Sequence, residues 1–409
     1  MFVMMADGVK KPENMCELCA TVITGLESVA VLECQEKLDF KPVRERGRIY
    51  FDISLDSLET AKNLRSIERL FVVVDRIEDF GSTKENSDVL QKFYDLAKQL
   101  HWKSALETWK AFTGYQGPVT KTDDDVAKQL SAEEIKSLPS FRVTCSRSGN
   151  NHDFKSSDAA AQLGGGLNDL FHWPVNLSNA DIEIILNVVD DRVVVGVALT
   201  RETQGRRNIE HFGPTTLKSS LAYCLLKLAD IKTGNGLPFS FHLVSVGDVV
   251  CDPMCGGGSI PIEALLNWPL CVHICGDHHE LAPSRTLANL SALTSKQNRK
   301  LPLDIYQWDV CNLPFKTNSM DVIVTDLPFG KKSGSKQNNW SLYPQALDEL
   351  ARVCPPKTGR AVILTHDKKA LAKTLQRMQK WWKVKLTLWV NMGGLQSGVY
   401  SLLRTTNSK

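Results

Sequence analysis

Apolar runs alternate with helical patterns through the second half of the chain. Each run has the length of a buried strand, and the segments between them carry apolar residues at helical spacing. The predicted strands cover residues 249–252, 272–277, 303–309, 321–326 and 360–365, and the predicted helices cover residues 259–267, 282–295, 342–353 and 368–381. This alternation predicts a parallel sheet in an α/β fold. Two last strands, at 384–390 and 398–404, flank Asn391-Met392-Gly393-Gly394 and predict a closing hairpin.

The first hundred residues show a different pattern, typical of a small α+β unit. Residues 1–19 lack apolar periodicity, so we expect a flexible leader there. The order strand, helix, strand, helix, strand then indicates a ferredoxin-like domain over residues 20–110. Its strands are predicted at 20–24, 47–53 and 70–74, and its helices at 26–38, 55–70 and 84–101.

A second α+β unit is predicted over residues 111–205. It opens with a polar segment, 115–138, that contains Gly117-Pro118 and is typical of a surface loop. A strand at 141–147 and a helix at 158–173 follow. Strands at 182–189 and 192–199 meet across Asp190-Asp191, which predicts a hairpin.

A basic segment with Arg201, Arg206 and Arg207 joins this unit to the α/β half. It is either a solvated linker or a strip that contacts nucleic-acid phosphates. A helix is then predicted to begin at His211-Phe212-Gly213-Pro214, with the proline near its first turn, and to run to about Leu228. We expect His211 to orient or support a site rather than to act as a catalyst.

Composition places the chain among ordinary globular proteins. Of its 409 residues, 43% are hydrophobic and 23% are charged, and this length allows two or three domains. No apolar run approaches the roughly 20 residues that span a bilayer, and the N-terminus lacks the pattern of a signal peptide. The net charge of +3 is too small to indicate nucleic-acid binding by itself. Among the 11 cysteines, Cys16 and Cys19 form a C-x-x-C pair without further ligands nearby, so we expect reduced thiols and no metal site.

A glycine-rich turn follows the first strand of the α/β half, in the order Asp252-Pro253-Met254-Cys255-Gly256-Gly257-Gly258-Ser259. Glycines let the backbone pass close to a ligand, and the helix that follows offers unpaired N–H groups. Strand, turn and helix form the nucleotide cradle of an open α/β sheet. The dinucleotide fingerprint is incomplete because Pro261 stands where its third glycine would fall. A tight strand-to-helix connection without a ligand is therefore the alternative.

Acidic residues end successive strands of this half at Asp252, Asp277 and Asp309, where open sheets bind their ligands. Asp277 lies about twenty residues beyond the turn, where a carboxylate accepts hydrogen bonds from ribose hydroxyls. Asp252 is placed to order the turn or to approach a ligand amine. Each aspartate alone is compatible with helix capping, but three in corresponding places favour a binding site.

The glycine turn together with Asp326-Leu327-Pro328-Phe329 resembles the S-adenosylmethionine-dependent methyltransferases that modify exocyclic amino groups. Their motif is Asp/Asn-Pro-Pro-Phe/Tyr, so Leu327 departs from it at the first proline while keeping the backbone carbonyl. The resemblance implies that the Asp326 carboxylate and the Leu327 carbonyl accept hydrogen bonds from the target amine. It also implies that Phe329 stacks on a flipped base.

The same resemblance implies a set of cofactor contacts. Asp309 would meet the adenine amino group. The remaining contacts to S-adenosylmethionine are expected from Asp252, Cys255, Gly256, Gly258 and Asp277.

A basic segment with Lys331, Lys332 and Lys336 follows the motif and closes at Trp340. Lying beside the expected site and lacking acids, it suits the phosphates of a nucleic-acid substrate. A plain surface loop is the alternative.

Residues from about 110 to 205, with the phrase FRVTCSRSGNNHDF, resemble a THUMP domain, an RNA-binding module of tRNA-modifying enzymes. Together with DPMCGGGSIPIEA and VTDLPFGKKSGSK, nearly the whole chain resembles the THUMP-domain tRNA guanosine N2-methyltransferases. The resemblance implies a Rossmann-like methyltransferase domain with a seven-stranded sheet over residues 206–409. It further implies methylation of guanine N2 at position 6 of the tRNA acceptor stem, a small zinc-binding activator subunit, and a cytoplasmic location.

Two departures from the family pattern stand out. Gly257 occupies a place where threonine or serine is common, and the segment 115–138 is shorter than usual. A sister enzyme that acts on a spliceosomal small nuclear RNA and a catalytically silent RNA-binding protein are the alternatives. The presence of Asp277, Asp309 and Asp326 at the spacing of a site argues against the silent protein.

Overall fold

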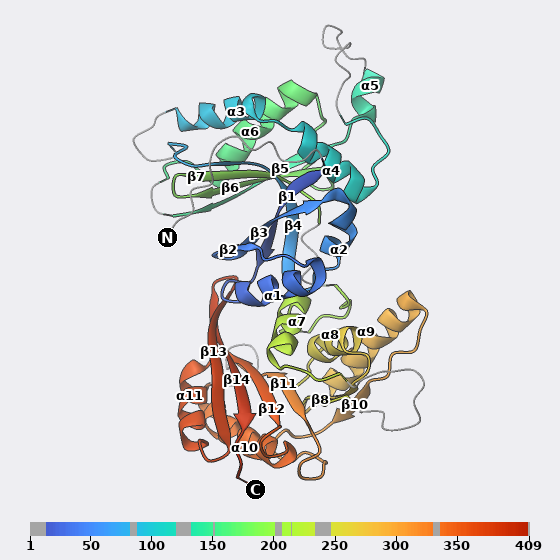
Figure 1. Ribbon diagram of the computed structural model, residues 1–409, viewed down its shortest axis with the longest axis vertical. Helices are drawn as coiled ribbons and strands as arrows, with labels where there is room; N and C mark the ends of the chain where they lie inside the picture. Colours follow the sequence, from blue (N-terminus) through green and yellow to red (C-terminus); the bar gives the residue numbers. More distant parts are fainter. Residues whose placement is uncertain are drawn as a thin grey trace.

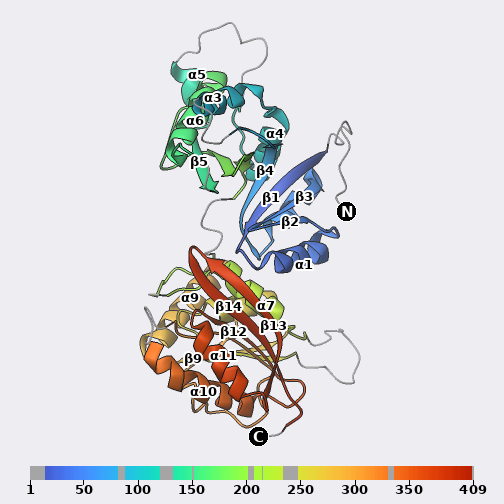
Figure 2. The ribbon, with the colours of Figure 1, turned by 90° about the vertical axis from the view of Figure 1, so that its left-hand side faces the viewer.

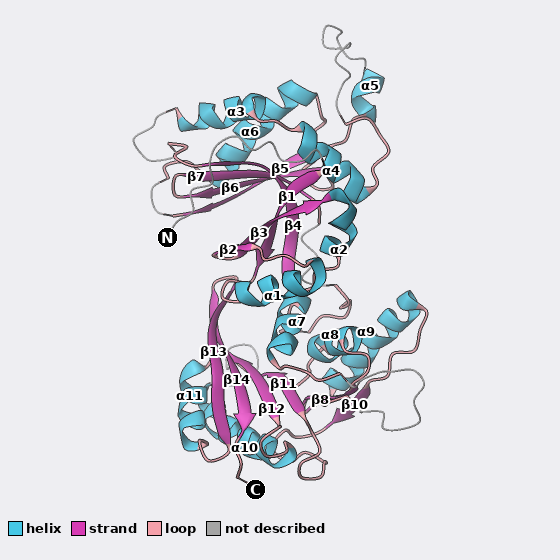
Figure 3. Cartoon of the chain, in the orientation of Figure 1, coloured by secondary structure: helices cyan, strands magenta, loops and turns pink. Residues whose placement is uncertain are grey.

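Two seven-stranded sheets, one in each half of the chain, organise the molecule (Figure 1). The computed structural model describes residues 14–81, 88–119, 132–149, 152–200, 207–213, 215–233, 247–329 and 336–407. Helices accompany both sheets, and the sheets follow one another along the long axis (Figure 3). None of the helices within the described ranges is long and apolar enough to cross a membrane.

The first sheet runs without a break through both predicted N-terminal units. Its strands are β1 (Met15–Val22), β2 (Val43–Glu45), β3 (Arg48–Ser54), β4 (Ile67–Ile77), β5 (Phe141–Ser148), β6 (Ile182–Val189) and β7 (Arg192–Ala198), in the order β2-β3-β1-β4-β7-β6-β5. β4 pairs antiparallel with β7, with Phe71 opposite Ala198, and this pairing joins the ferredoxin-like strands to the others. The boundary predicted near residue 110 therefore divides two parts of one sheet.

The helices of this half are α1 (Glu27–Leu38), α2 (Leu58–Lys62), α3 (Val89–Gln99), α4 (Lys103–Thr113), α5 (Ala132–Ser137) and α6 (Ser156–Phe171). Several predictions were wrong or incomplete here. The leader predicted over residues 1–19 extends too far into the chain, because β1 begins at Met15 and pairs with β3 from Met15 to Thr21. Helix α4 was not predicted, although Leu106 and Trp109 are buried on one of its faces and Trp102 is buried at its N-cap. The expected loop at 115–138 contains α5.

The helix predicted over 55–70 ends at Lys62, and the cause is a buried carboxylate on another helix. Glu33 of α1 is fully buried and accepts hydrogen bonds from the backbone N–H groups of Arg65 and Ser66 at 2.8 Å and from the Ser66 hydroxyl at 2.5 Å. Lys37 donates a further hydrogen bond at 2.6 Å. Because Glu33 holds these N–H groups, they are not available to continue α2, and the chain enters β4 at Ile67.

Replacing Glu33 with glutamine is expected to lower the free energy of unfolding by about 3 kcal/mol at neutral pH, since it leaves Lys37 without its buried partner. Burial raises the pKa of Glu33, but the Lys37 ammonium and the Ser66 hydrogen bonds outweigh burial and hold the pKa below its usual value of 4.5. The wild-type protein therefore carries this stabilisation above about pH 4.5 and loses it as the pH falls through the lower native value. Denaturant unfolding between pH 3 and pH 7 measures both effects.

Glu59→Gln is the matched control, because Glu59 lies on the same unit with its side chain 76% exposed. A Glu33→Gln variant as stable as Glu59→Gln at pH 7, with the same acid dependence as the wild type, would contradict the role of Glu33.

The second sheet has the order β10-β9-β8-β11-β12-β14-β13. Its strands are β8 (Val249–Asp252), β9 (Val272–Asp277), β10 (Asp304–Gln307), β11 (Val322–Asp326), β12 (Arg360–Thr365), β13 (Trp382–Met392) and β14 (Leu395–Arg404), and its helices are α7 (Ser219–Leu228), α8 (Ser259–Asn267), α9 (Leu281–Gln297), α10 (Lys336–Val353) and α11 (Lys368–Arg377). β8 to β12 are parallel, and β13 and β14 form the predicted antiparallel hairpin. The predicted Rossmann-like seven-stranded sheet is confirmed. The carboxyl ends of its parallel strands meet at one edge.

Two helix starts in this half differ from the predictions. α7 begins at Ser219 rather than at His211, and α10 begins at Lys336 rather than at residue 342. Pro214 lies outside the described residues, so its predicted place in a first helical turn is not assessed. The early start of α10 places Trp340 on a helix instead of in a loop.

The two halves contact each other through α1, α7 and the β13–β14 hairpin (Figures 1 and 2). The backbone N–H of Asn391 donates to the carbonyl of Thr24 at 3.0 Å, so the hairpin forms a β-bridge with the first half. Gly25 has φ = +100°, and a Cβ there would lie 2.0 Å from the carbonyl oxygen of Trp389. Only glycine fits at this contact.

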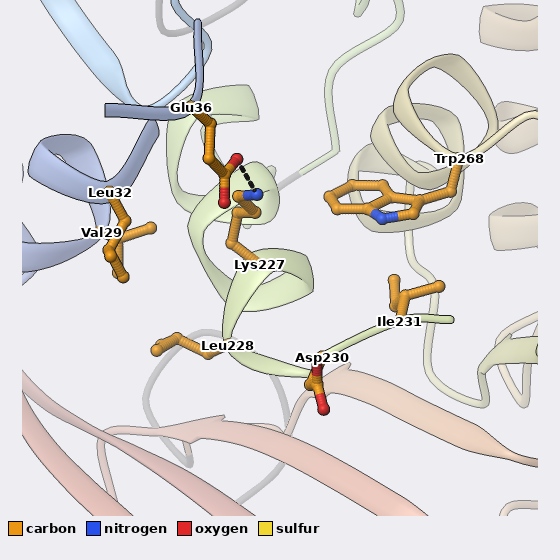
Figure 4. A pocket seen from close by; sticks show the side chains of 8 residues that line it. All are labelled: Val29, Leu32, Glu36, Lys227, Leu228, Asp230, Ile231 and Trp268. Carbon is orange, nitrogen blue, oxygen red and sulfur yellow. Dashed lines mark hydrogen bonds and ion pairs between the residues drawn. The ribbon is translucent and has the colours of Figure 1, made fainter. Parts of the chain in front are cut away.

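A small cavity of about 180 Å³ lies in the same interface, between α1, α7 and Trp268 (Figure 4). An ion pair between Glu36 and Lys227 crosses it. Apolar side chains including Val29 and Ile231 line the rest. None of the residues predicted to form the functional site lines this cavity.

Candidate active site

The glycine turn is held open at the carboxyl end of β8. The N–H of Cys255 donates to the carbonyl of Gly276 at 2.9 Å, and the N–H of Gly258 donates to the carbonyl of Cys255 at 2.8 Å. Gly256 and Gly258 have φ of +55° and +85°, which favour glycine. A Cβ on Gly256 would meet no atom within 4 Å, so this part of the turn faces open space, whereas the Gly258 Cβ position is closed by Thr286. Cys255 itself is buried, and its sulfur lies 3.7 Å from the Thr286 hydroxyl.

Asp277 connects the end of β9 to this turn. Its Oδ2 accepts a hydrogen bond from the Gly256 N–H at 3.0 Å, and its Oδ1 accepts one from the His279 N–H at 2.9 Å. Each carboxylate oxygen has a further lone pair. The partly exposed carboxylate is thereby fixed at the edge where the sequence predicted a ribose-binding acid.

Asp252 and Asp326 end the two neighbouring strands β8 and β11. Asp252 is buried, whereas Asp326 is partly exposed and only its Oδ1 is buried. Asp252 is 3% exposed and accepts hydrogen bonds from the Met254 N–H at 3.2 Å and from the Thr325 hydroxyl at 2.9 Å. Burial raises its pKa to about 7, although these two hydrogen bonds partly oppose the shift. Of its two predicted roles, these contacts support the ordering of the turn.

Asp326 differs from Asp252 because its Oδ1 is buried and has no hydrogen-bond partner. Burial raises the pKa of Asp326 well above its usual value, and the charge of Asp252 adds to the effect. An unpaired buried carboxylate oxygen is costly, so its presence indicates a site for a hydrogen-bond donor from a ligand.

The chain after Asp326 is anchored by two residues of α10. Asn339 and the Tyr343 hydroxyl donate hydrogen bonds to the carbonyl of Pro328 at 3.2 and 2.7 Å. Leu327, which departs from the family motif, is 1% exposed and packs in the core beneath the sheet. The rigidity that a second proline would provide comes here from core packing and from α10. Neither Asn339 nor Tyr343 was among the predicted site residues, although their spacing of four residues places both on one helix face.

Phe329 and Asp309 are two further predicted site residues, and they differ in exposure. The Phe329 ring is partly buried, and its centroid lies 6.0 Å from that of the His366 ring. Asp309 is exposed, and its Oδ1 accepts a hydrogen bond from the Cys311 N–H at 2.9 Å.

Asn289 of α9 was not among the predicted site residues, yet it contacts both the glycine turn and the backbone of Glu210 and His211. Its Oδ1 accepts from the N–H groups of Glu210 and His211 at 2.9 and 2.7 Å, and its Nδ2 donates to the carbonyls of His211 and Gly257 at 3.0 and 2.9 Å. These bonds hold residues 209–213 in a non-helical course along the glycine turn, which explains why α7 starts late. His211 is exposed, so Asn289 positions its backbone, not its ring.

Replacing Asn289 with alanine is expected to weaken cofactor binding by roughly ten-fold, because the Gly257 carbonyl loses the donor that fixes the turn. Titration calorimetry with S-adenosylmethionine measures this change. Leu287→Ala, on the exposed side of the same helix, is the control. Equal cofactor affinity in both variants would show that Asn289 contributes to stability alone.

The predicted phosphate-contacting residues fall into two groups. The first group lies outside the described residues and consists of Arg201, Arg206, Lys331, Lys332 and the side chain of Lys336. Arg207 is described, and its side chain is only 13% exposed, so little of its charge is available to a phosphate. Its guanidinium donates to the carbonyl of Arg65 at 2.6 Å and pairs with the buried Glu263 at 3.4 Å. Arg207 thus connects the two halves of the chain.

Comparison with known families assigns both halves. Residues 206–398 match the family described as the RMKL-like methyltransferase domain, and residues 124–198 match the THUMP domain. Among solved structures, TrmN from Thermus thermophilus has a TM-score of 0.71 at 23% identity and covers 95% of this chain and 99% of its own. SMU.472, a putative methyltransferase complexed with SAH, has a TM-score of 0.67 at 15% identity and covers 97% of this chain and 100% of its own. These likenesses establish the fold.

Curated relatives extend over almost the whole chain. The human tRNA (guanine(6)-N(2))-methyltransferase THUMP3 is 41% identical and covers 96% of this chain and 89% of its own length. The tRNA (guanine(6)-N2)-methyltransferase of Methanocaldococcus jannaschii is 24% identical over 93% of this chain. The human U6 snRNA (guanine-N(2))-methyltransferase THUMPD2 is 29% identical over 87%. The chain belongs to the THUMP3 family of tRNA (guanine(6)-N(2))-methyltransferases.

Proposed function

We propose that this protein transfers a methyl group from S-adenosylmethionine to the exocyclic N2 of guanosine 6 in the tRNA acceptor stem. The observation that carries the proposal is Asp326, whose buried Oδ1 awaits a donor at the carboxyl end of β11, beside the glycine turn. The 41% identity to the human tRNA enzyme, against 29% to the human U6 snRNA enzyme, favours tRNA over small nuclear RNA.

The residues around the turn fit S-adenosylmethionine. Open space faces Gly256, where a side chain would obstruct a ligand, and the partly exposed Asp277 carboxylate is fixed next to it. We propose that Asp277 accepts hydrogen bonds from the ribose hydroxyls and that the exposed Asp309 accepts one from the adenine amino group. The backbone of Cys255, Gly256 and Gly258 would line the cofactor, with Asp252 holding the turn in place. When bound, S-adenosylmethionine supplies a methyl group on a positively charged sulfur.

Asp326 is proposed to position and activate the target amine. The lone pair of a guanine amino group is delocalised into the ring, so the amine is a poor nucleophile. Hydrogen bonds from its two N–H groups to the Asp326 carboxylate and the Leu327 carbonyl favour a geometry in which the lone pair is directed at the methyl group. Because burial raises the pKa of Asp326, its Oδ1 is also suited to take the proton that the amine loses.

Phe329 is proposed to stack on the target base, supported from behind by His366. The Pro328 carbonyl, anchored by Asn339 and Tyr343, keeps the backbone at Leu327 and Phe329 in a fixed course. These contacts pre-organise the pocket before the base enters.

The first half of the chain, residues 20–205, is proposed to bind the tRNA 3′ end and to set the distance to the methylated base. The domain limits 20–110, 111–205 and 206–409 remain predictions, as do phosphate contacts by Arg201, Arg206, Lys331, Lys332 and Lys336. From the family resemblance we also propose a small zinc-binding activator subunit and a cytoplasmic location.

The test is methyl transfer from labelled S-adenosylmethionine to total tRNA by the full chain, with and without the activator subunit, followed by nucleoside analysis. N2-methylguanosine is the expected product, with a higher yield when the activator is present. Tight tRNA binding with no product in either condition would favour the silent RNA-binding protein.

A further inference from the structure

Helix α11 carries a basic face that begins at the edge of the sheet where Asp326 lies. Its residues follow directly on β12, whose end pairs with the end of β11. Lys369, Lys373 and Arg377 recur every four residues and are all exposed, so they share one side of the helix. Lys368 precedes them and Lys380 follows them in the chain. In Figure 2, α11 lies on the side of the methyltransferase sheet that faces the viewer, below the β13–β14 hairpin.

Within the described residues, no ion pair involves Lys368, Lys369, Lys373 or Arg377. Asp367 is the acid nearest in sequence, and its carboxylate accepts hydrogen bonds from the Ala370 N–H and from Asn339, both at 3.2 Å. The basic face therefore presents its charge to solvent.

Exposed tryptophans accompany the lysines. Lys373 lies over the ring of Trp340 at 5.4 Å, and Lys368 lies over the ring of Trp389 at 5.0 Å. Trp340 is 41% exposed and Trp389 56% exposed. Flat aromatic rings next to cations are the combination that binds nucleic-acid strands, through base stacking and phosphate contacts.

The basic face is continuous with the candidate site. His366, two residues before Lys368, lies next to Phe329 of the catalytic motif. At its other side, Trp389 belongs to the hairpin that contacts the first half of the chain at Gly25. A strand of RNA that leaves the pocket on this side would meet Lys368 first and then the exposed face of α11.

We propose that the α11 face, formed by Lys368, Lys369, Lys373 and Arg377 with Trp340 and Trp389, binds the phosphate backbone of the substrate RNA next to the methylated nucleotide. The inference rests on the proposed function for the identity of the RNA. Charge complementarity and continuity with the candidate site select RNA as the occupant. If the basic face is only solvated and does not contact RNA, removal of its charges leaves the affinity for tRNA unchanged.

The test compares two triple variants of the full chain that remove equal charge. The first variant alters the α11 face and combines Lys369→Gln, Lys373→Gln and Arg377→Gln. The control variant combines Lys296→Gln, Arg299→Gln and Lys300→Gln. These exposed cations lie at or just after the end of α9, where the chain leads away from the site edge toward the start of β10. Affinity for unmodified tRNA is measured between 50 and 300 mM salt, and binding of S-adenosylmethionine is measured separately.

The α11 variant is expected to bind tRNA roughly ten-fold to a hundred-fold more weakly near 150 mM salt, with a slope of log affinity against log salt reduced by about two to three. Its KM for tRNA rises while kcat at saturating tRNA and the cofactor affinity stay near wild type, and the α9 variant is unchanged. Equal tRNA affinity and salt slope in the two variants would overturn the inference. If the wild-type chain binds tRNA through this face but does not methylate it, the RNA-binding role of α11 holds and the proposed methyl transfer is wrong. If the wild-type chain does not bind tRNA, both proposals are wrong.

Discussion

Replacing Asp326 with alanine is expected to lower kcat by about 10²- to 10³-fold, the effect of removing one pre-organised group that acts on the reacting atoms. The carboxylate has no partner for its buried Oδ1, so the free protein does not depend on it for hydrogen bonding at that atom. Stability and cofactor affinity should therefore change little. Single-turnover methyl transfer to tRNA, with saturating cofactor, measures the loss in the chemical step.

Asp326→Asn is the matched control, because the amide keeps one acceptor oxygen and loses the charge and the capacity to take a proton. We expect its rate to fall between that of the wild type and that of the alanine variant. Wild-type turnover by Asp326→Ala would contradict the assignment of the catalytic residue.

Replacing Asp277 with alanine is expected to weaken S-adenosylmethionine binding by about a hundred-fold, equivalent to roughly 3 kcal/mol, since charge-assisted hydrogen bonds to two ribose hydroxyls are lost. The Gly256 N–H, which donates to Oδ2 at 3.0 Å, also loses its acceptor. Titration calorimetry with the cofactor gives the affinity, and tRNA binding is measured in parallel to separate the two sites.

Asp304→Ala provides the comparison for Asp277, since Asp304 is an exposed aspartate at the start of β10, away from the carboxyl ends of the strands. Its cofactor affinity should match that of the wild type. Cofactor affinity for Asp277→Ala within two- to three-fold of that value would exclude a ribose contact by this carboxylate.

Local patterns in the sequence were sufficient to predict most of the methyltransferase sheet. Its strands are short apolar runs that alternate with amphipathic helices, and both the order of elements and the final hairpin follow from that alternation. Asp252, Asp277 and Asp326 were found for the same reason, because each ends such a run.

Contacts between residues that are distant in the sequence could not be predicted from these local patterns. Glu33 ends α2 through Arg65, 32 residues away, and Asn289 holds the backbone of His211 across 78 residues. The pairing of β4 with β7 likewise joins units that the sequence suggested were separate. Arg207 was predicted to be an exposed cation because its partner, Glu263, lies 56 residues further along the chain and could not be inferred from local patterns.

The buried, unpaired Oδ1 of Asp326 is likewise a feature of the candidate site that local sequence patterns could not predict. The motif identified the residue, but its unpaired Oδ1 depends on the packing of Leu327 and on the anchoring of Pro328 by α10. Only the folded chain brings these groups together.

Methylation of a defined tRNA transcript shows whether guanosine 6 is the nucleotide that this enzyme modifies. The transcript carries guanosine at position 6 of the acceptor stem, a matched transcript carries adenosine there with its pairing partner adjusted, and the product is located by digestion and mass spectrometry. We expect one N2-methylguanosine, at position 6, with none in the adenosine transcript and almost none with Asp326→Ala. N2-methylguanosine at another position, or an equal yield from both transcripts, would contradict this expectation.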